Sequence, residues 1–220
     1  MRTSYLTVKG YGEHGIVIQK SRFIAYIQRA VTEEEAQEFI QKIKKMNWNA
    51  THNCSAYMVG ENNQFQKAND DGEPSGTAGV PMLEVLKKKN LQDTVVVVTR
   101  YFGGIKLGAG GLIRAYSKAT SEGIKYVGMV ERKRMRKMTT VIDYPWLGKV
   151  ENAFRSSIYE IQDIAYLDRV QISTYVDIGK EDTFKKWVTE LTNGQGEIVD
   201  GDTLYVEIPV SDSRNFLPED

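Results

Sequence analysis

The chain has 220 residues and no formal net charge, and 41% of its residues are hydrophobic. That composition is typical of a soluble globular protein with one large domain or two small ones, and it excludes a disordered or repetitive chain. No stretch approaches the ~20 apolar residues that a membrane helix requires, and the N-terminal residues lack the apolar core of a secretion signal. We therefore expect a cytoplasmic protein without membrane contact. The single cysteine, Cys54, rules out an internal disulfide and agrees with a reducing compartment.

The two halves of the chain carry opposite charges. Residues 1–135 hold 20 lysines and arginines against 13 acidic residues, a net of +7, whereas residues 136–220 hold 9 against 16, a net of −7. This asymmetry predicts two units, of which the first is basic enough to meet a polyanion such as a nucleic acid. The alternative is compensating surface charge without any ligand.

The first half is predicted to form a mixed α/β unit. Thr32 and the three glutamates that follow it have the spacing of a capping box, and apolar residues recur behind them with a helical period. Pro81 suits the first turn of a second helix, where its missing N–H is harmless. Strands are expected at residues 5–8, 15–19, 22–28, 53–59, 64–68 and 95–98. Helices are expected at residues 33–46, at 81–89 and at about 111–126.

The second half follows a basic run at residues 131–137. This run is either a basic patch or a polar connector with alternating exposed strand positions. Beyond it we expect strands at 138–144, 161–167, 170–178 and 203–210, and helices at 146–158 and 182–191. The order strand, helix, strand, strand, helix, strand is that of the ferredoxin-like split βαβ fold. The predicted domains are therefore 1–135 and 136–212, with a frayed tail at 213–220.

Residues 95–117 combine an apolar strand, a basic and aromatic triplet and a glycine-rich segment that leads into a helix. Glycine costs stability in regular elements, so we interpret these glycines as giving backbone N–H groups access to an anion, and not as packing residues. The N-terminus of a helix directly behind them favours negative charge. The alternative is a tight strand-to-helix turn without a ligand. The five glycines are Gly103, Gly104, Gly108, Gly110 and Gly111.

Two nucleotide-binding motifs are excluded in this segment. Gly103 and Gly108 have P-loop spacing, but Ala109 and Gly110 stand where a lysine and a serine or threonine would hold the phosphates and magnesium. A dinucleotide fingerprint that starts at Gly108 requires glycine or alanine at position 113, which is Ile113. NTP hydrolysis and dinucleotide binding are therefore not supported, and no cofactor is expected.

Residues 69–79 form a second polar stretch, which we predict to be a loop. Its acidic residues are candidate ligands of a hard cation, with neighbouring hydroxyls on a phosphate ester, as in an enzyme that acts on a phosphorylated or nucleotide substrate. The interpretation that we favour is that the acidic residues form turns and caps. The candidate metal ligands are Asp70, Asp71 and Glu73, and the candidate hydroxyls are those of Ser75 and Thr77.

His52 and Cys54 provide a further catalytic hypothesis. They lie two residues apart, on one face of a predicted strand, where a thiolate and an imidazole would form a pair. The stronger interpretation is that a lone cysteine in apolar surroundings belongs to the core. His14 is the only other histidine, which leaves too few ligands for a zinc site.

Two motifs stand in order in the first half: D-D-G-E-P-S-G-T-A-G at positions 70–79 and R-Y-F-G-G-I-K-L-G-A-G-G-L at positions 100–112. Together they resemble the signature of the IMPACT/YigZ family in its bacterial two-domain form. The resemblance implies an α+β protein whose first domain is similar to domain IV of elongation factor G, a ribosomal-protein-like βαβ fold, and whose ferredoxin-like second domain is similar to its domain V. Eukaryotic relatives act in translational control, so the resemblance also implies a role in regulating translation and association with the ribosome.

We favour a binding module for RNA or the ribosome over an enzyme. Backbone N–H groups and cationic side chains would hold phosphates, and an aromatic ring would stack on an unpaired base. Because side chains alternate across a strand, one of Tyr101 and Phe102 is expected to be buried and the other free. The acidic second half is a candidate for docking a protein partner. The expected nucleic-acid and anion site comprises Arg100, Tyr101, Phe102, Gly103, Gly104, Lys106, Gly108, Gly110, Gly111, Arg114 and Lys118, together with Ser75, Gly76 and Thr77.

Overall fold

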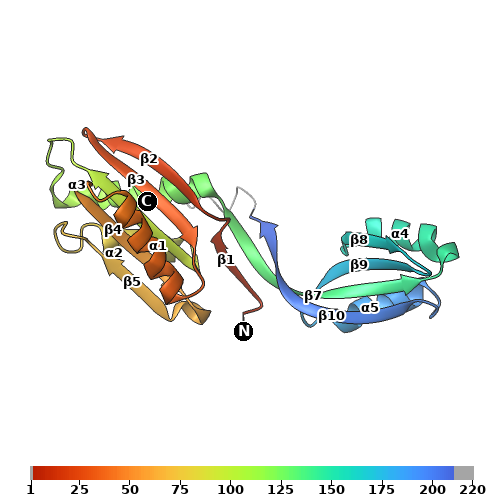
Figure 1. Cartoon of the computed structure of the whole chain (residues 1–220). Helices are drawn as coiled ribbons and strands as arrows, with labels where there is room; N and C mark the ends of the chain where they lie inside the picture. The colour runs from red at the N-terminus through yellow and green to blue at the C-terminus, as the bar shows by residue number, and fades with distance from the viewer. Residues whose placement is uncertain (1, 211–220) are drawn as a thin grey trace. The chain divides into compact units, whose positions relative to one another are not determined.

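The computed structural model describes residues 2–210, which fall into two compact units (Figure 1). The first unit contains the chain up to Glu131 together with residues 208–210, and the second contains Arg132–Glu207. Helices and strands occur in both units, so the predicted α+β class is confirmed. The predicted tail at 213–220 lies outside the described residues. None of the described helices combines the length and the apolar character needed to span a membrane.

The first unit is built on a five-stranded antiparallel sheet in the order β2-β3-β6-β4-β5. β6 is central, and its valines are buried on both faces because successive side chains point to opposite sides. Val95 and Val97 pack into one hydrophobic cluster, and Val96 and Val98 pack into the other. The strands are β2 (Gly12–Ile18), β3 (Ser21–Arg29), β4 (His52–Val59), β5 (Phe65–Asn69) and β6 (Thr94–Tyr101), and a short 3-10 turn, η1 (Glu61–Asn63), joins β4 to β5.

Three helices cover the two faces of this sheet. α1 (Glu33–Met46) packs on the face of Val95 and Val97, whereas α2 (Gly79–Lys88) and α3 (Gly108–Val127) pack on the opposite face. The start of α1 agrees with the predicted cap: Thr32 Oγ1 accepts a hydrogen bond from the Glu35 N–H at 3.2 Å. The Glu35 carboxylate in turn accepts from the Val31 N–H at 2.7 Å. Both ends of this helix lie at the predicted residues.

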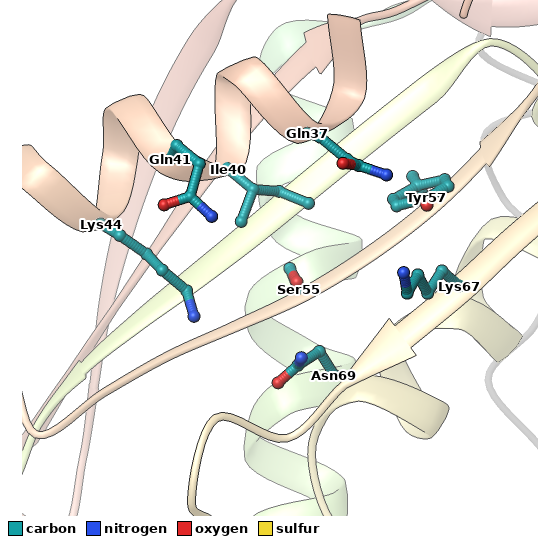
Figure 2. A pocket seen from close by; sticks show the side chains of 8 residues that line it. All are labelled: Gln37, Ile40, Gln41, Lys44, Ser55, Tyr57, Lys67 and Asn69. Carbon is teal, nitrogen blue, oxygen red and sulfur yellow. The ribbon is translucent and has the colours of Figure 1, made fainter. Parts of the chain in front are cut away.

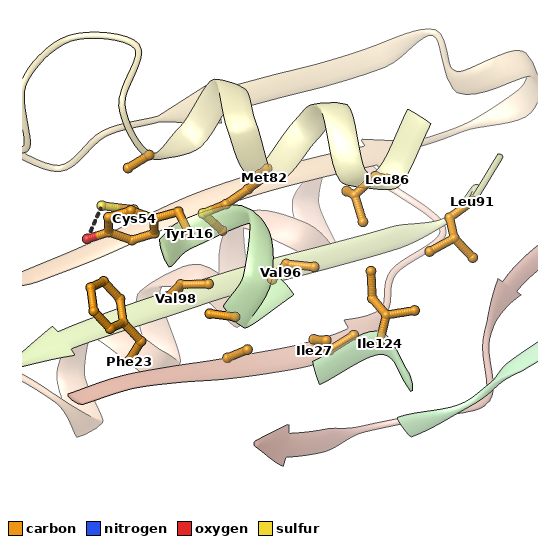
Figure 3. Close-up of a cluster of buried hydrophobic side chains, with 14 of the residues drawn as sticks. Phe23, Ile27, Cys54, Met82, Leu86, Leu91, Val96, Val98, Tyr116 and Ile124 are labelled. Carbon is orange, nitrogen blue, oxygen red and sulfur yellow. Dashed lines mark hydrogen bonds between the residues drawn. The ribbon is translucent and has the colours of Figure 1, made fainter. Parts of the chain in front are cut away.

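The larger of the two clusters joins α2 and α3 to the sheet. Figure 3 shows Met82 and Leu86 from α2 and Tyr116 from α3 packed around the central strand. Gly123 lets α3 approach β3 closely, because a Cβ at this position would lie only 2.8 Å from the Ala25 Cβ. The helix position is therefore set by the absence of a side chain as well as by apolar contacts.

Two boundaries near the glycine-rich segment differ from the prediction. α3 begins at Gly108, earlier than the expected start at residue 111, so Gly108, Gly110 and Gly111 belong to its first turn and not to the preceding loop. Glycine has low helix propensity, which placed the predicted start too late, but packing of the apolar face of α3 overrides propensity. β6 also continues to Tyr101, beyond the apolar run that indicated it.

The second unit has the predicted ferredoxin-like topology. Its strand order is β10-β7-β9-β8, and β9 is antiparallel to both β7 and β8. Numbered by their order in the sequence, the four strands lie in the order 4-1-3-2. Phe154 and Phe184, one from each helix of this unit, lie in its hydrophobic core. β7 begins at Met129 in the first unit, and β1 (Ser4–Val8) is its neighbour in the strand order. The elements are β7 (Met129–Ile142), a 3-10 turn η2 (Tyr144–Trp146), α4 (Leu147–Arg155), β8 (Ile161–Tyr166), β9 (Val170–Asp177), α5 (Glu181–Leu191) and β10 (Glu197–Pro209).

The basic run 131–137 lies inside β7, whose start was predicted at residue 138. Lys133 Nζ lies 2.6 Å from Asp177 Oδ2, and Arg136 Nε lies 3.2 Å from Glu181 Oε1. The run is therefore a strand with paired charges, which agrees with the connector interpretation and not with a free basic patch. The alternating apolar pattern missed this part of the strand because five of its seven residues are lysine or arginine.

We predict that Gly123→Ala destabilises the protein by about 1–3 kcal/mol, because the added methyl group overpacks the contact between α3 and β3. The matched control is Gly10→Ala, since a Cβ at Gly10 has no heavy atom within 4 Å. Urea unfolding monitored by circular dichroism measures both variants. Equal stability of the two would show that α3 does not depend on this close approach.

Candidate functional site

The carboxylate of Glu73 joins the acidic loop (residues 70–79) to three elements of the first unit. Its Oε1 accepts hydrogen bonds from Arg100 Nη1 at 2.7 Å and from the Tyr116 hydroxyl at 2.8 Å. His52 Nε2, at the start of β4, lies 3.8 Å from its Oε2. The Glu73 and Arg100 side chains are only 3% and 6% exposed. The loop is therefore fixed to β4, β6 and α3 through one buried carboxylate.

The Asp70 carboxylate caps the N-terminus of α2. It accepts hydrogen bonds from the backbone N–H groups of Gly76 and Gly79 at 2.8 Å each and of Ala78 at 3.1 Å. Burial alone would raise the pKa of Asp70, but these three donors outweigh burial and lower its pKa below the ordinary value. Asp70 thus serves as the cap that Ala78, at the N-cap position, does not provide.

Asp71 completes the set of acidic residues in this loop. Its Oδ2 accepts from the Asn53 N–H and its Oδ1 from Lys44 Nζ, both at 2.6 Å. All three carboxylates of the loop therefore accept hydrogen bonds from within the chain, which is the geometry of turns and caps and argues against a hard-cation site. Within residues 2–210, no group of three or more His, Cys, Asp or Glu side chains is placed to hold a metal ion.

The other predicted contacts from the acidic loop are mostly internal. Thr77 is buried, and its hydroxyl donates to the Pro74 carbonyl at 2.6 Å. The Gly76 N–H is held by Asp70. Gly76 and Thr77 are therefore not available to a ligand, in contrast to the prediction. Ser75 is exposed.

Cys54 does not form a pair with His52. Its Sγ donates to the Asp70 carbonyl at 3.0 Å and lies 3.3 Å from the Tyr116 hydroxyl (Figure 3). Burial, against a smaller opposing effect of the Tyr116 contact, raises the pKa of the Cys54 thiol to about 12. His52 Nδ1 donates to the Asp71 carbonyl at 2.8 Å, and its Nε2 faces Glu73. The thiolate–imidazole hypothesis is therefore wrong, and Cys54 is a core residue.

Gly103 is a packing residue, contrary to the prediction. A Cβ at this position would lie 2.1 Å from the backbone C and O of Lys20, in the turn between β2 and β3. Its N–H donates to Ser21 Oγ at 3.1 Å, and the preceding Phe102 N–H donates to Thr51 Oγ1 at 3.0 Å. These two backbone groups are thus satisfied inside the protein. Gly104 has a φ of 86°, in the left-handed region that favours glycine.

The first turn of α3 presents backbone donors to solvent. The N-cap residue, Leu107, makes no capping hydrogen bond through its side chain. Gly108, Ala109 and Gly110 are exposed and carry at most one methyl group to shield the backbone. A helix N-terminus has unpaired N–H groups and a partial positive charge, both of which favour an anion. Anion binding at this turn stays a prediction.

The predicted cations differ in their availability. Lys106 and Arg114 are exposed and form no ion pair within the described part of the chain. Lys118 is exposed and lies 3.7 Å from Glu122. Arg100 is buried against Glu73, so it supports the site from beneath and does not reach a phosphate at the surface.

Tyr101 and Phe102 differ in how far their side chains are exposed. The Tyr101 hydroxyl donates to Asn47 Oδ1 at 3.0 Å, whereas the Phe102 ring is 46% exposed. Sequence reasoning missed Arg22, whose guanidinium lies 4.5 Å from the centre of the Tyr101 ring. Arg22 is the register partner of Tyr101 across β3 and β6, a tertiary pairing that no local sequence pattern specifies.

With this geometry established, comparison with known proteins gives a consistent result. The Impact N-terminal domain matches residues 19–124, and a domain of unknown function, DUF1949, matches residues 140–195. The IMPACT family member YvyE of Bacillus subtilis (strain 168) is 63% identical over 211 residues, which are 96% of this chain and 97% of that protein. The chain belongs to the IMPACT family.

Other IMPACT family members are more distant. A member from Haemophilus influenzae is 33% identical over 81% of this chain and 87% of its own. Protein IMPACT of Oryctolagus cuniculus is 36% identical over 44% of this chain and 32% of its own. A crystal structure described as that of a hypothetical protein superposes with a TM-score of 0.59 at 26% identity, over 92% of this chain and 99% of that one.

We predict that Asp70→Ala destabilises the protein by about 1–2 kcal/mol at neutral pH, the cost of losing a helix cap. The folded pKa of Asp70 lies below its unfolded value, so its contribution is present above the unfolded pKa of about 3.9 and is lost as the pH falls through the folded pKa. Urea unfolding should therefore show a difference from the wild type that shrinks as the pH is lowered below about 3.9. The exposed Asp168→Ala is the control, and a pH-independent difference would contradict the assignment.

We predict that Cys54 reacts with iodoacetamide at neutral pH at least about tenfold more slowly in the native protein than in urea, because the thiol is buried and protonated. Mass spectrometry at timed intervals measures the extent of alkylation. Equal rates in both conditions would show that Cys54 is accessible in the native state.

Proposed function

We propose that the chain binds single-stranded RNA, free or within the ribosome, and acts as a non-enzymatic regulator of translation. Binding would use the loop–helix surface, which we define as Phe102, Lys106, residues 108–111 and Arg114. The observation that carries this proposal is the glycine-rich first turn of α3, which has no side-chain cap, together with two cations that form no ion pair within residues 2–210 and an exposed aromatic ring.

The first turn of α3 supplies a site for a phosphate. Its exposed glycines allow a phosphate to approach the backbone without a side chain in the way, and the N–H groups there lack a capping partner from Leu107. At Gly110 an added Cβ would meet only Arg114 Nη1, at 3.5 Å. The guanidinium of Arg114 is therefore near the same backbone and adds charge to the same site.

The Phe102 ring supplies a platform for an unpaired base. Stacking of a base on an exposed aromatic ring is tolerant of sequence and contributes about 1–3 kcal/mol per base. Ile105 and Ile113 are also exposed, at 40% and 42%, and extend the apolar part of this surface. A surface with cations, backbone donors and an aromatic ring suits single-stranded RNA better than a duplex, whose bases are stacked.

The enzymatic alternative has no observation in its favour. The candidate metal ligands Asp70, Asp71 and Glu73 accept internal hydrogen bonds, and the Cys54 thiol is protonated and buried. The role in translation rests on the family resemblance of the sequence. Docking of a protein partner on the acidic second unit and a cytoplasmic location stay predictions.

Filter-binding titration of the full chain with a short single-stranded RNA at several salt concentrations tests the proposal. We predict a linear fall of the logarithm of the binding constant with the logarithm of salt concentration. Arg114→Ala and Lys106→Ala should each reduce the slope by about 0.7, the value expected for one phosphate contact on a single strand. Phe102→Ala should weaken binding about tenfold at every salt concentration.

The matched controls are Lys42→Ala and Lys45→Ala, which remove the same charge from the exposed face of α1. They should leave both the affinity and the slope within a factor of about two of the wild type. Binding that is indifferent to salt and to Arg114→Ala would remove the proposal. Equal losses in the α1 controls would indicate a diffuse effect of net charge instead of this surface.

A further inference from the structure

A pocket of about 160 Å³ lies between α1 and the strands β4 and β5 of the first unit (Figure 2). It exists because α1 packs on β6 and β4, and β5 continues the sheet beyond the helix as an edge strand. The pocket shares no lining residue with the loop–helix surface, so its chemistry is independent of the proposed RNA site.

Regular structure places the side chains that line this pocket. Gln37, Gln41 and Lys44 lie at positions i, i+4 and i+7 of α1 and therefore share one face of the helix. Ser55 on β4 is the register partner of Asn69 on β5. Lys67 lies two residues before Asn69 and points to the same face of the sheet. Side chains on a helix and on paired strands are held more firmly than side chains on loops.

Ser55 is a buried polar residue without an internal partner. The residue as a whole is only 5% exposed, and no side-chain hydrogen bond of Ser55 is found within residues 2–210. The hydroxyl oxygen itself retains some accessible surface in the pocket that it lines, so it can bond to water or to a ligand there. In Figure 2 its side chain lies near the middle of the labelled side chains that line the pocket.

The charge around the pocket is positive. Lys67 is exposed and forms no ion pair within the described residues. Lys44 is neutralised by Asp71, which lies outside the lining, and no lining side chain is acidic. The Asn69 Oδ1 accepts from the Asp71 N–H at 2.8 Å, so the Asn69 amide group retains its two N–H donors for a further contact.

We propose that this pocket binds a small organic anion through a carboxylate or phosphate group. Lys67 supplies the charge, and the Ser55 hydroxyl and the Asn69 amide donate hydrogen bonds to the oxygen atoms. The side chains of Gln37 and Gln41 form the opposite wall and contact the uncharged part of the ligand. The volume of about 160 Å³ is roughly that of five water molecules, which suits the charged group and a short stem of a small metabolite.

NMR titration of the full 15N-labelled protein tests this site. The probes are inorganic phosphate, glycerol 3-phosphate, malate and, as an uncharged control, glycerol. We expect at least one anion to shift the backbone amides of Ser55 and Asn69 with saturation, and glycerol to leave them unchanged. Saturation by the two phosphates alone would assign a phosphate ligand, and saturation by malate alone would assign a carboxylate.

Two variants and a control identify the contacts. Lys67→Ala should weaken binding of the saturating anion about tenfold, because it removes the charge that faces the anion. Ser55→Ala removes only the hydroxyl group and should weaken binding about threefold. Lys42→Ala removes the same charge from α1 outside this pocket and should leave the affinity unchanged. Absence of saturable shifts with every anion, or equal effects of Lys67→Ala and Lys42→Ala, would overturn the proposal.

Discussion

The hydrogen bonds of the Glu73 carboxylate with Arg100 and Tyr116 determine how the acidic loop (residues 70–79) and the glycine-rich segment (residues 100–112) meet in space. Glu73 belongs to the acidic loop, Arg100 to the end of β6 and Tyr116 to α3. Because both charged side chains are buried, loss of either one would leave an uncompensated charge at a cost of about 3–5 kcal/mol. The interaction thus fixes the end of β6, from which the glycine-rich segment leaves the sheet, against both the loop and the helix that follows.

This arrangement separates supporting residues from residues at the surface. Arg100, Glu73 and Cys54 are buried. Arg100 Nη1 donates to the Glu73 carboxylate, and Cys54 Sγ donates to the Asp70 carbonyl. Phe102, Lys106 and the first turn of α3 are exposed directly beyond them. Burial raises the pKa of the Tyr116 hydroxyl well above its ordinary value, which keeps it a donor to Glu73. The polar residues of the interior therefore form a support, and the chemistry open to a ligand lies with the exposed ones.

Local signals in the sequence predicted much of the fold. The capping box at Thr32 located the start of α1, and the order of short apolar segments gave the ferredoxin-like second unit, because each depends on neighbouring residues or on a regular period. Tertiary contacts account for what was missed. Gly103 packs on a turn more than eighty residues away in sequence, and Arg100 finds its carboxylate 27 residues away, so neither role is visible in a local pattern. Arg22 reaches the site through strand pairing for the same reason.

The central claim is that the exposed half of these segments binds RNA while the buried half holds it in place. The most direct measurement is a map of backbone amide shifts in the full 15N-labelled chain during titration with a short single-stranded RNA. We predict saturable shifts at residues 108–111 and at Phe102, with Gly76 and Ala78 unchanged because Asp70 already holds their N–H groups. Shifts centred on the acidic loop, or confined to residues 132–207, would contradict the claim.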